Sequence, residues 1–290
     1  MKIGISLGML RPQLWLAVTE EADRLGFESV WLPDHVVFPR AGEGSPYADA
    51  DHPPVPADVP VFDVFAYLGF LAARTSRIRL GTLVYNLGLR HPFVAARGVG
   101  TVDMLSQGRV EFGVGASWLR AEWEAMGLDF ATRGRRVDEA LEVCRRLWRD
   151  DTVEFHGEFF DFEPVAFAPK PVQAPWPPLH IGGDGTAARR RAATVGDGWV
   201  PMNHTLEDAV AAARVISRHR DELGRTRPLE LTLVGGEGTD DLRRRADAGV
   251  GRAIVRPWRS SRGALDGLRR FADEVLPAVR DHPVADLEPR

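Results

Sequence analysis

The sequence lacks a second cysteine, a long hydrophobic run and a surplus of basic residues, and each absence excludes a class of protein. The one cysteine, Cys144, leaves no partner for an internal disulfide and no basis for a thiolate metal cluster. No apolar run approaches the roughly 18 residues of a membrane-spanning helix. The first residues, 2–7, are typical of a strand and not of a secretory signal, so we expect a cytoplasmic protein that does not bind membranes.

Charge and size indicate an ordinary globular protein. The formal net charge is −4, because 37 Lys and Arg residues stand against 41 Asp and Glu residues. A nucleic-acid-binding protein usually has a basic face, so we expect no nucleic-acid partner. The chain has 290 residues, of which 44% are hydrophobic, and this is enough for one large core.

Short apolar or alternating stretches predict strands, and helical patterns follow them. Strands are expected at residues 3–8, 28–33, 78–84, 110–115, 179–183, 198–202, 229–234 and 252–255. Helices are expected at 14–25, 63–74 and 92–105, around 137–148, from 186 and from 205 onward, and at 263–276. Alternating strands and helices favour a parallel sheet, and eight repeats favour an α/β fold of the (β/α)8 TIM barrel type. An open sheet is the alternative.

Two stretches interrupt this rhythm within what we expect to be a single domain, residues 1–290. Residues 36–61 are rich in Pro, Gly and Asp and predict a long irregular loop, which is either a lid or binding element or a disordered segment. Residues 150–178 contain a predicted hairpin around Gly157 and then a Pro-rich run. We interpret both stretches as insertions in the barrel.

In a TIM barrel the functional groups gather at the carboxyl ends of the strands. The fifth predicted strand ends in Gly-Gly-Asp-Gly-Thr, residues 182–186, at the start of a helix. Bare backbone amides beside the positive end of a helix form a cradle for a phosphate or another anion. A tight turn that binds nothing is the alternative. Gly183, Gly185 and Ala188 also match the dinucleotide fingerprint, but no acid follows the next strand to bind a ribose, so we reject a Rossmann site.

Asp34 and His35 follow the second predicted strand and are the clearest candidates for proton chemistry. A histidine there can serve as a general acid or base, a metal ligand or a hydrogen-bond donor. Taken alone, such a pair is more often structural. A metal site would need further ligands, and the other candidates lack ligand spacing, so we expect no metal. They are Glu111, Glu122, His156 and His180.

Glu111 is expected to point into the barrel, where an unpaired carboxylate is costly. Arg79 has the matching parity on the neighbouring third strand. We predict that the two side chains form a structural salt bridge inside the barrel. Cys144 lies on the apolar face of the helix around 137–148, so we interpret it as a core residue.

In this order, the motifs resemble the bacterial luciferase-like superfamily of flavin and deazaflavin enzymes, and in particular its coenzyme F420-dependent oxidoreductase branch. The similarity extends from about residue 2 to 255. The matching segments are 26–31 with Asp34-His35, 77–84, 90–92, 105–109, 113–118 with Glu122, 169–173, 181–183 and 196–199. The resemblance implies a (β/α)8 barrel with insertions that binds coenzyme F420 or reduced FMN over the carboxyl ends of its strands.

The resemblance also implies roles for individual residues. Leu83 and Val84 match a bulge with a non-proline cis peptide bond that supports the ring, and His35 matches the active-site histidine. The residues matched to contacts with the ring and its polyol are Asp34, Asn86, Ala116 and Ser117. The segment matched to the phosphate site comprises Gly182, Gly183, Asp184, Gly185 and Thr186.

The chain departs from the sugar-phosphate dehydrogenases of this superfamily, because Trp118 stands where they carry a carboxylate and their cationic clamp is missing. Trp118, Tyr85 and Trp258 instead suggest an apolar pocket. We expect an F420-dependent enzyme that transfers a hydride between the deazaflavin and a small organic substrate, working as a homodimer. The first alternative is an FMNH2-dependent monooxygenase with flavin hydroperoxide chemistry. A metal-dependent barrel isomerase or hydrolase and a non-catalytic flavin-binding protein are further alternatives.

Overall fold

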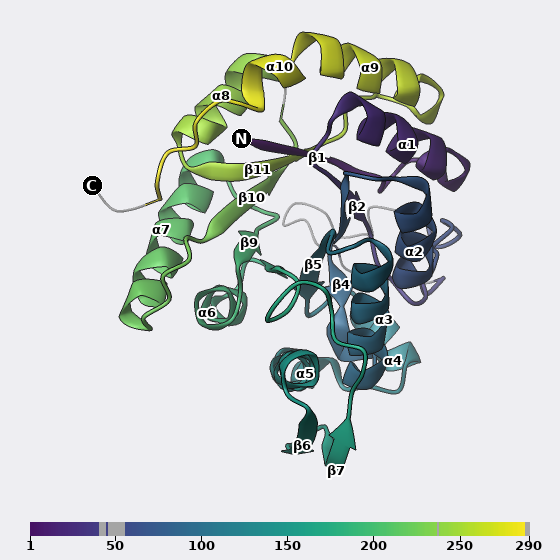
Figure 1. Ribbon diagram of the computed structural model, residues 1–290, viewed down its shortest axis with the longest axis vertical. Coiled ribbons are helices and arrows are strands. Elements are labelled where there is room, and N and C mark those ends of the chain that lie inside the picture. Colours follow the sequence, from purple (N-terminus) through teal and green to yellow (C-terminus); the bar gives the residue numbers. More distant parts are fainter. Residues whose placement is uncertain (41–44, 46–55, 237, 288–290) are drawn as a thin grey trace.

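The structure is a computed structural model that describes residues 1–40, 45, 56–236 and 238–287. Most of the loop predicted at 36–61, namely 41–44 and 46–55, lies outside the described residues. In Figure 1 the strands stand at the centre and the helices follow one another around them.

The central strands form one closed parallel barrel. They are β1 Lys2–Ser6, β2 Ser29–Leu32, β3 Arg79–Thr82, β4 Tyr85–Asn86, β5 Val110–Gly115, β8 Leu179–Gly182, β9 Gly198–Val200, β10 Glu230–Val234 and β11 Val250–Val255. The order is β3-β2-β1-β11-β10-β9-β8-β5-β4, and an additional pairing of β3 with β5 closes the circle. Both β3 and β4 pair with β5, so they are two parts of one strand position, and the predicted eight-stranded barrel is confirmed.

The interruption of the third strand is the main departure from the predicted strands. The peptide bond between Leu83 and Val84 is cis, as the resemblance implies. Pairing with β5 runs from Leu80 opposite Val110 and resumes at Tyr85 opposite Val114. The predicted strand 78–84 therefore ends early, and a short second segment follows it.

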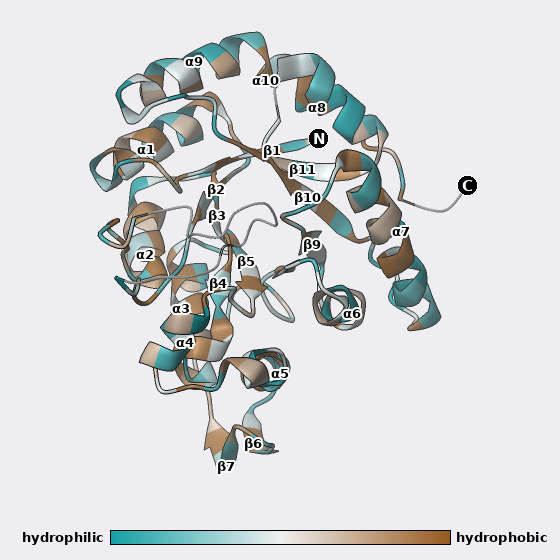
Figure 2. Ribbon diagram, turned by 180° about the vertical axis from the view of Figure 1, so that it is seen from behind, coloured by the Kyte–Doolittle hydropathy of each residue, from teal (hydrophilic) through white to brown (hydrophobic). Residues whose placement is uncertain are grey.

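Helices cover the outside of the barrel, and none in the described ranges has both the length and the apolar character needed to cross a membrane. They are α1 Trp15–Leu25, α2 Val64–Arg74, α3 Pro92–Leu105, α4 Arg120–Ala125, α5 Arg133–Arg149, α6 Thr186–Thr194, α7 Leu206–Glu222, α8 Gly238–Asp247, α9 Ala264–Glu274 and α10 Leu276–Val279. Helices α4, α8 and α10 were not among the specific predictions. Figure 2 shows hydrophilic and hydrophobic residues interleaved along α8 and α9, as expected for helices with one face on the barrel.

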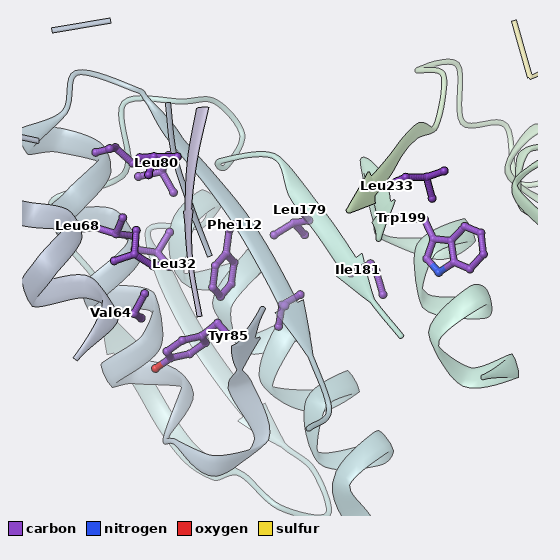
Figure 3. Packing of buried hydrophobic residues seen from close by; sticks show 14 of the residues in the cluster. Leu32, Val64, Leu68, Leu80, Tyr85, Phe112, Leu179, Ile181, Trp199 and Leu233 are labelled. Atoms are coloured by element: carbon purple, nitrogen blue, oxygen red, sulfur yellow. The ribbon is translucent and has the colours of Figure 1, made fainter. Parts of the chain in front are cut away.

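The main core lies between the strands and the helices. The outward side chains of the strands, such as Leu80, Phe112 and Ile181, are fully buried there. Figure 3 shows Leu32 and Leu80 beside Leu68 of α2, with Phe112 deeper in the same layer. Burial of each such side chain contributes roughly 1.5–3 kcal/mol. Cys144 is also fully buried in this layer, which confirms its interpretation as a core residue.

Inside the barrel, the amino-terminal ends of the strands carry charged side chains instead of aliphatic ones. Glu111 forms ion pairs with Arg79 and His180, which confirms the predicted salt bridge. Arg252 is fully buried and lies 3.0 Å from Glu28, 2.6 Å from Glu230 and 3.4 Å from Glu111. The charges therefore neutralise one another at this end of the barrel.

The predicted insertion after α5 contains the expected antiparallel hairpin, β6 Thr152–His156 and β7 Asp161–Ala166. In Figure 1 it projects beyond α5, away from the barrel. Glu139 of α5 accepts hydrogen bonds from the turn amides of Glu158 and Phe159 at 2.8 and 2.9 Å. The hairpin also reaches the start of α3, where the ring centroid of Phe160 lies 5.5 Å from that of His91.

The buried position of Glu111 gives a prediction for stability. Burial raises the pKa of its carboxyl group, but Arg252, His180 and Arg79 outweigh burial and hold that pKa below its usual range. Glu111→Gln removes the carboxylate that Arg79 and His180 share, and one of the three that surround Arg252, so it is expected to lower the free energy of unfolding by about 3–5 kcal/mol at neutral pH. Urea unfolding followed by circular dichroism measures this. The matched change Glu274→Gln, at the exposed end of α9, should cost less than about 0.5 kcal/mol.

The same carboxylate predicts a pH dependence. The unfolded carboxyl group titrates near pH ~4.3, and the folded one titrates at lower pH. In that interval the unfolded state binds the additional proton, so the stability from Glu111 is present above it and falls as the pH drops through it. Glu111→Gln should therefore flatten the decline of stability below about pH 4.3. An equally steep decline in both proteins would contradict this assignment.

Candidate active site

Asp34 and His35 leave β2 in opposite directions and bind different partners. Asp34 is 3% exposed and receives both terminal nitrogens of Arg90 at 2.6 and 2.7 Å. It also accepts the backbone N–H of Asn86 at 2.8 Å, and the Asn86 side chain donates to the Asp34 carbonyl at 2.8 Å. Burial raises the pKa of Asp34, and Arg90 and the Asn86 amide oppose that shift. These residues fasten the end of β2 to the end of β4.

His35 is held by a carboxylate that the sequence did not single out for this role. Its Nδ1 lies 2.9 Å from Oε2 of Glu122, a fully buried residue of α4. Oε1 of Glu122 accepts the backbone N–H of Val36 at 2.6 Å and that of Val37 at 3.3 Å. An ionised carboxylate only accepts hydrogen bonds, so the contact assigns the proton of the neutral ring to Nδ1. Nε2 has no hydrogen-bond partner in the described part of the chain and can accept a proton.

Aromatic side chains enclose His35. The ring centroid of Phe38 lies 4.4 Å from that of His35, and the centroid of Trp118 lies 5.7 Å away at nearly a right angle. Ser117, just before the tryptophan, has φ of 63°, which non-glycine residues rarely adopt. The surroundings of the histidine are therefore apolar on these two sides.

Leu83 and Val84 form an apolar shelf between β3 and β4, and both are partly exposed. Glycines on the neighbouring strands make room for Val84. A Cβ added to Gly115 would lie 2.7 Å from Val84, and one added to Gly182 would lie 2.9 Å from it. Gly115 and Gly182 are thus required by packing within the protein, in addition to any role toward a ligand.

The turn after β8 has the features of an anion cradle. Gly185 is the N-cap residue of α6 and Thr186 is its first residue, and no side chain caps the helix. A Cβ added to Gly185 would meet nothing within 4 Å, while Gly183 has φ of +114°. Nε of Arg189, one turn into α6, is buried without a hydrogen-bond partner among the described residues. The uncapped backbone amides at the start of α6 fit a phosphate group.

The carboxylate of Asp184, in the same turn, already has partners within the protein. It accepts the backbone N–H of Met202 at 2.8 Å and the side-chain amide of Asn203 at 3.1 Å, and it lies 3.3 Å from His204. These contacts join the turn after β8 to the one after β9. Its predicted contact with a cofactor stays a prediction.

The predicted site residues all lie at the carboxyl ends of strands: Leu83 and Val84 follow β3, and the others lie at the ends of β2, β4, β5 and β8. Asn86 is 4% exposed and already paired with Asp34, whereas Ala116, Ser117 and Thr186 keep part of their surface open. The structure adds Arg90, which appeared in the sequence only as part of a matching segment, and Glu122, which appeared in one and among the rejected metal ligands. The signal that could have found them is a carboxylate and a guanidinium close to the ends of neighbouring strands.

Comparison with known families decides the affiliation. The model of the luciferase-like monooxygenase family matches residues 10–272. The chain belongs to the luciferase-like monooxygenase family. Proteins of this family are oxidoreductases and monooxygenases, and both F420-dependent and FMN-dependent proteins are among the relatives of this chain.

Three individual proteins show how similar this luciferase-like protein is to known relatives. An uncharacterised protein of Mycobacterium tuberculosis (strain ATCC 25618 / H37Rv) is 32% identical over 244 residues, covering 83% of this chain and 84% of that protein. The crystal structure of the monooxygenase RslO1 from Streptomyces bottropensis has a TM-score of 0.76 at 22% identity and covers 96% of this chain and 99% of its own. An F420-dependent secondary alcohol dehydrogenase, solved with an F420-acetone adduct, has a TM-score of 0.75 at 19% identity, covering 97% of this chain and 99% of its own. At these identities the two structures support the fold.

The contacts of Glu122 predict that its removal loosens the segment that carries His35. Glu122→Ala leaves the amides of Val36 and Val37 without an acceptor, so the free energy of unfolding should fall by about 2–4 kcal/mol. In hydrogen exchange, the Val36 amide should lose most of its protection. Glu124→Ala, on the same helix with its side chain 60% exposed, is the control and should change neither quantity appreciably. Unchanged protection of Val36 would contradict the assigned role.

Proposed function

We propose that the protein is a coenzyme F420-dependent oxidoreductase that transfers a hydride between the deazaflavin and a small organic substrate. The observation that carries the proposal is the arrangement around His35, where one nitrogen is anchored by a buried carboxylate and the other has no partner among the residues that the structure describes. When a hydride is added to a carbonyl carbon, one proton is consumed at the oxygen. When a hydride is removed from an alcohol carbon, one proton is released. A single histidine in an apolar setting is sufficient for that proton.

The described residues fit such a cofactor. The uncapped start of α6 and the open space at Gly185 suit its phosphate, and the shelf of Leu83 and Val84 suits a flat ring. Asp34, Asn86, Ala116 and Ser117 are proposed to line the ring and the polyol. When bound, the deazaflavin supplies the carbon that accepts or donates the hydride.

His35 has the proposed role of moving the proton. In the oxidation of an alcohol, Nε2 takes the hydroxyl proton, and in the reverse direction it returns the proton to the carbonyl oxygen. Glu122 keeps Nδ1 protonated and stabilises the positive charge that the ring then carries. Phe38 and Trp118 exclude water from two sides of the ring, which strengthens these electrostatic effects.

The cofactor assignment predicts a clear preference in binding. Coenzyme F420 is expected to bind with a submicromolar Kd and FMN much more weakly, as measured by fluorescence titration of the purified protein. Gly185→Val should weaken F420 binding by about tenfold or more, because its side chain has room in the protein but occupies the approach to the amides. Gly134→Val, at the other open glycine of ordinary backbone conformation near α6, should leave the Kd unchanged. Tight binding of FMN without binding of F420 would favour the FMNH2-dependent monooxygenase instead.

The role of His35 predicts a separation between turnover and binding. His35→Ala should lower kcat by roughly 10²–10⁴ and change the Kd of the cofactor by less than about threefold. The measurements are steady-state kinetics and the same fluorescence titration. His156→Ala, on the exposed hairpin, is the control and should behave like the wild type. Equal losses in kcat and affinity would make His35 a binding residue.

A further inference from the structure

Four exposed arginines gather at one part of the barrel mouth. We define the arginine cluster as Arg11, Arg256, Arg259 and Arg262. Arg11 follows β1, and the other three follow β11. Within the part of the chain that the structure describes, none of the four side chains has an ion pair or a hydrogen bond. Many other exposed arginines do face a carboxylate, as Arg24 faces Glu21 at 2.7 Å.

The two loops that carry the cluster are in contact. β1 and β11 are neighbouring parallel strands, with Ile5 opposite Val255 (Figure 1). Beyond them, the backbone N–H of Arg11 donates to Oγ of Ser261 at 3.1 Å, which joins positions 250 residues apart. The sequence shows no cationic group here because its members come from opposite ends of the chain.

No carboxylate in these two segments balances the cluster. Residues 3–19 and 253–265 contain neither Asp nor Glu. Asp266, the next acidic residue, faces Arg269 at 3.9 Å. The chain has a formal net charge of −4, so the cluster does not follow from a basic composition. Like charges held close together repel one another, and a bound anion would relieve that repulsion.

Arg256 continues the row of β11 side chains that faces the inside of the barrel. Side chains alternate along a strand. Arg252 in this row contacts Glu111 inside the barrel, whereas Val255 lies in the outer core. We therefore expect Arg256 on the inner side of the mouth. β11 occupies the eighth strand position, and the loops after the seventh and eighth strands of TIM barrels often bind phosphate.

The cluster and the anion cradle lie on opposite sides of the mouth. β8, which ends in the cradle, is four steps from β1 in either direction around the ring, when β3 and β4 are counted as one position. One phosphate group cannot contact both places. His35 follows β2, which is next to β1. Since neighbouring strands are about 4.8 Å apart, the end of β11 is roughly 10 Å from that of β2.

Resting on the proposed function, we infer that the arginine cluster binds an anionic group of the substrate, a carboxylate or a phosphate, while the reacting carbon lies near His35. Guanidinium groups bind both oxyanions through two parallel hydrogen bonds. The distance between the ends of β11 and β2 leaves room for a few carbon atoms between the anionic group and the reacting carbon. Phe38 and Trp118 then surround the uncharged part of the substrate.

The test compares the binding of 4-oxopentanoate with that of its methyl ester, which has the same ketone but no charge. Isothermal titration calorimetry follows each ketone with the protein alone and with oxidised F420, which cannot reduce a ketone. The anion should bind at least tenfold more tightly than the ester, the effect of one charge-assisted hydrogen bond. Its Kd should also rise with salt, which screens exposed charges.

Equal affinities of 4-oxopentanoate and its ester, or an affinity of the anion that salt does not change, would overturn the inference. A further titration with 4-oxopentyl phosphate distinguishes the two oxyanions. Whichever of the two anions binds more tightly identifies the group that the cluster recognises.

Matched variants locate the binding surface. Arg256→Gln combined with Arg262→Gln should raise the Kd of 4-oxopentanoate at least tenfold and change that of the ester by less than about threefold. Because both side chains are exposed, the thermal unfolding transition should not fall. Arg214→Gln with Arg218→Gln, at exposed positions on α7, removes the same charge and should leave both Kd values unchanged. Equal effects of the two double variants would contradict the assignment.

The same measurements separate this inference from the proposed function. The double variant at Arg256 and Arg262 should bind F420 as tightly as the wild type does. Weaker binding of F420 would assign the cluster to the cofactor and refute the inference. A protein that prefers the anion but binds no F420 would refute the proposed function and support the inference. Hydride transfer to neutral ketones, without preference for the anion, would support the function and refute the inference.

Discussion

The mouth of the barrel depends on one contact, in which the Val84 side chain packs against the backbone of glycines on the neighbouring strands. The Val84 side chain lies inside the barrel, within 3.3 Å of a Cβ placed on Gly113 and closer still to one placed on Gly115 or Gly182. A larger residue at Gly115 of β5 or Gly182 of β8 would displace it. The third strand resumes only after Val84, and this places the Asn86 amide within reach of Asp34. The glycines, the broken strand and the anchored carboxylate are therefore one packing arrangement.

A second constraint follows from the alternation of side chains along an extended segment. Because neighbouring residues point to opposite sides, Asp34 and His35 cannot share a partner. The chain supplies each with its own counter-charge, Arg90 for the carboxylate and Glu122 for the imidazole. Each pair brings together segments far apart in sequence, which fixes the end of β2 from both sides. Because Asp34 and His35 are both paired, the surroundings of the histidine are less polar than the residue types there suggest.

The sequence alone predicted the barrel, the core face of α5 and the interior pair of Arg79 and Glu111, because each rests on periodicity or parity within short segments. It did not predict that Glu122 binds His35. That contact joins positions 87 residues apart, and no local pattern encodes such a distance. The bounds of helix α8 were not predicted either, since its arginines and aspartates leave few apolar positions to mark where it begins and ends.

Glycines near the end of a strand can be required for two different reasons. Sequence reasoning attributes bare backbone near a strand end to the close approach of a ligand. The structure shows that Gly115 and Gly182 first accommodate Val84, whereas a Cβ at Gly185 would face open space. Only a glycine such as Gly185 distinguishes ligand binding from packing, because its replacement would disturb no contact within the protein. A function inferred from glycine patterns is therefore supported best by the positions that the fold itself does not need.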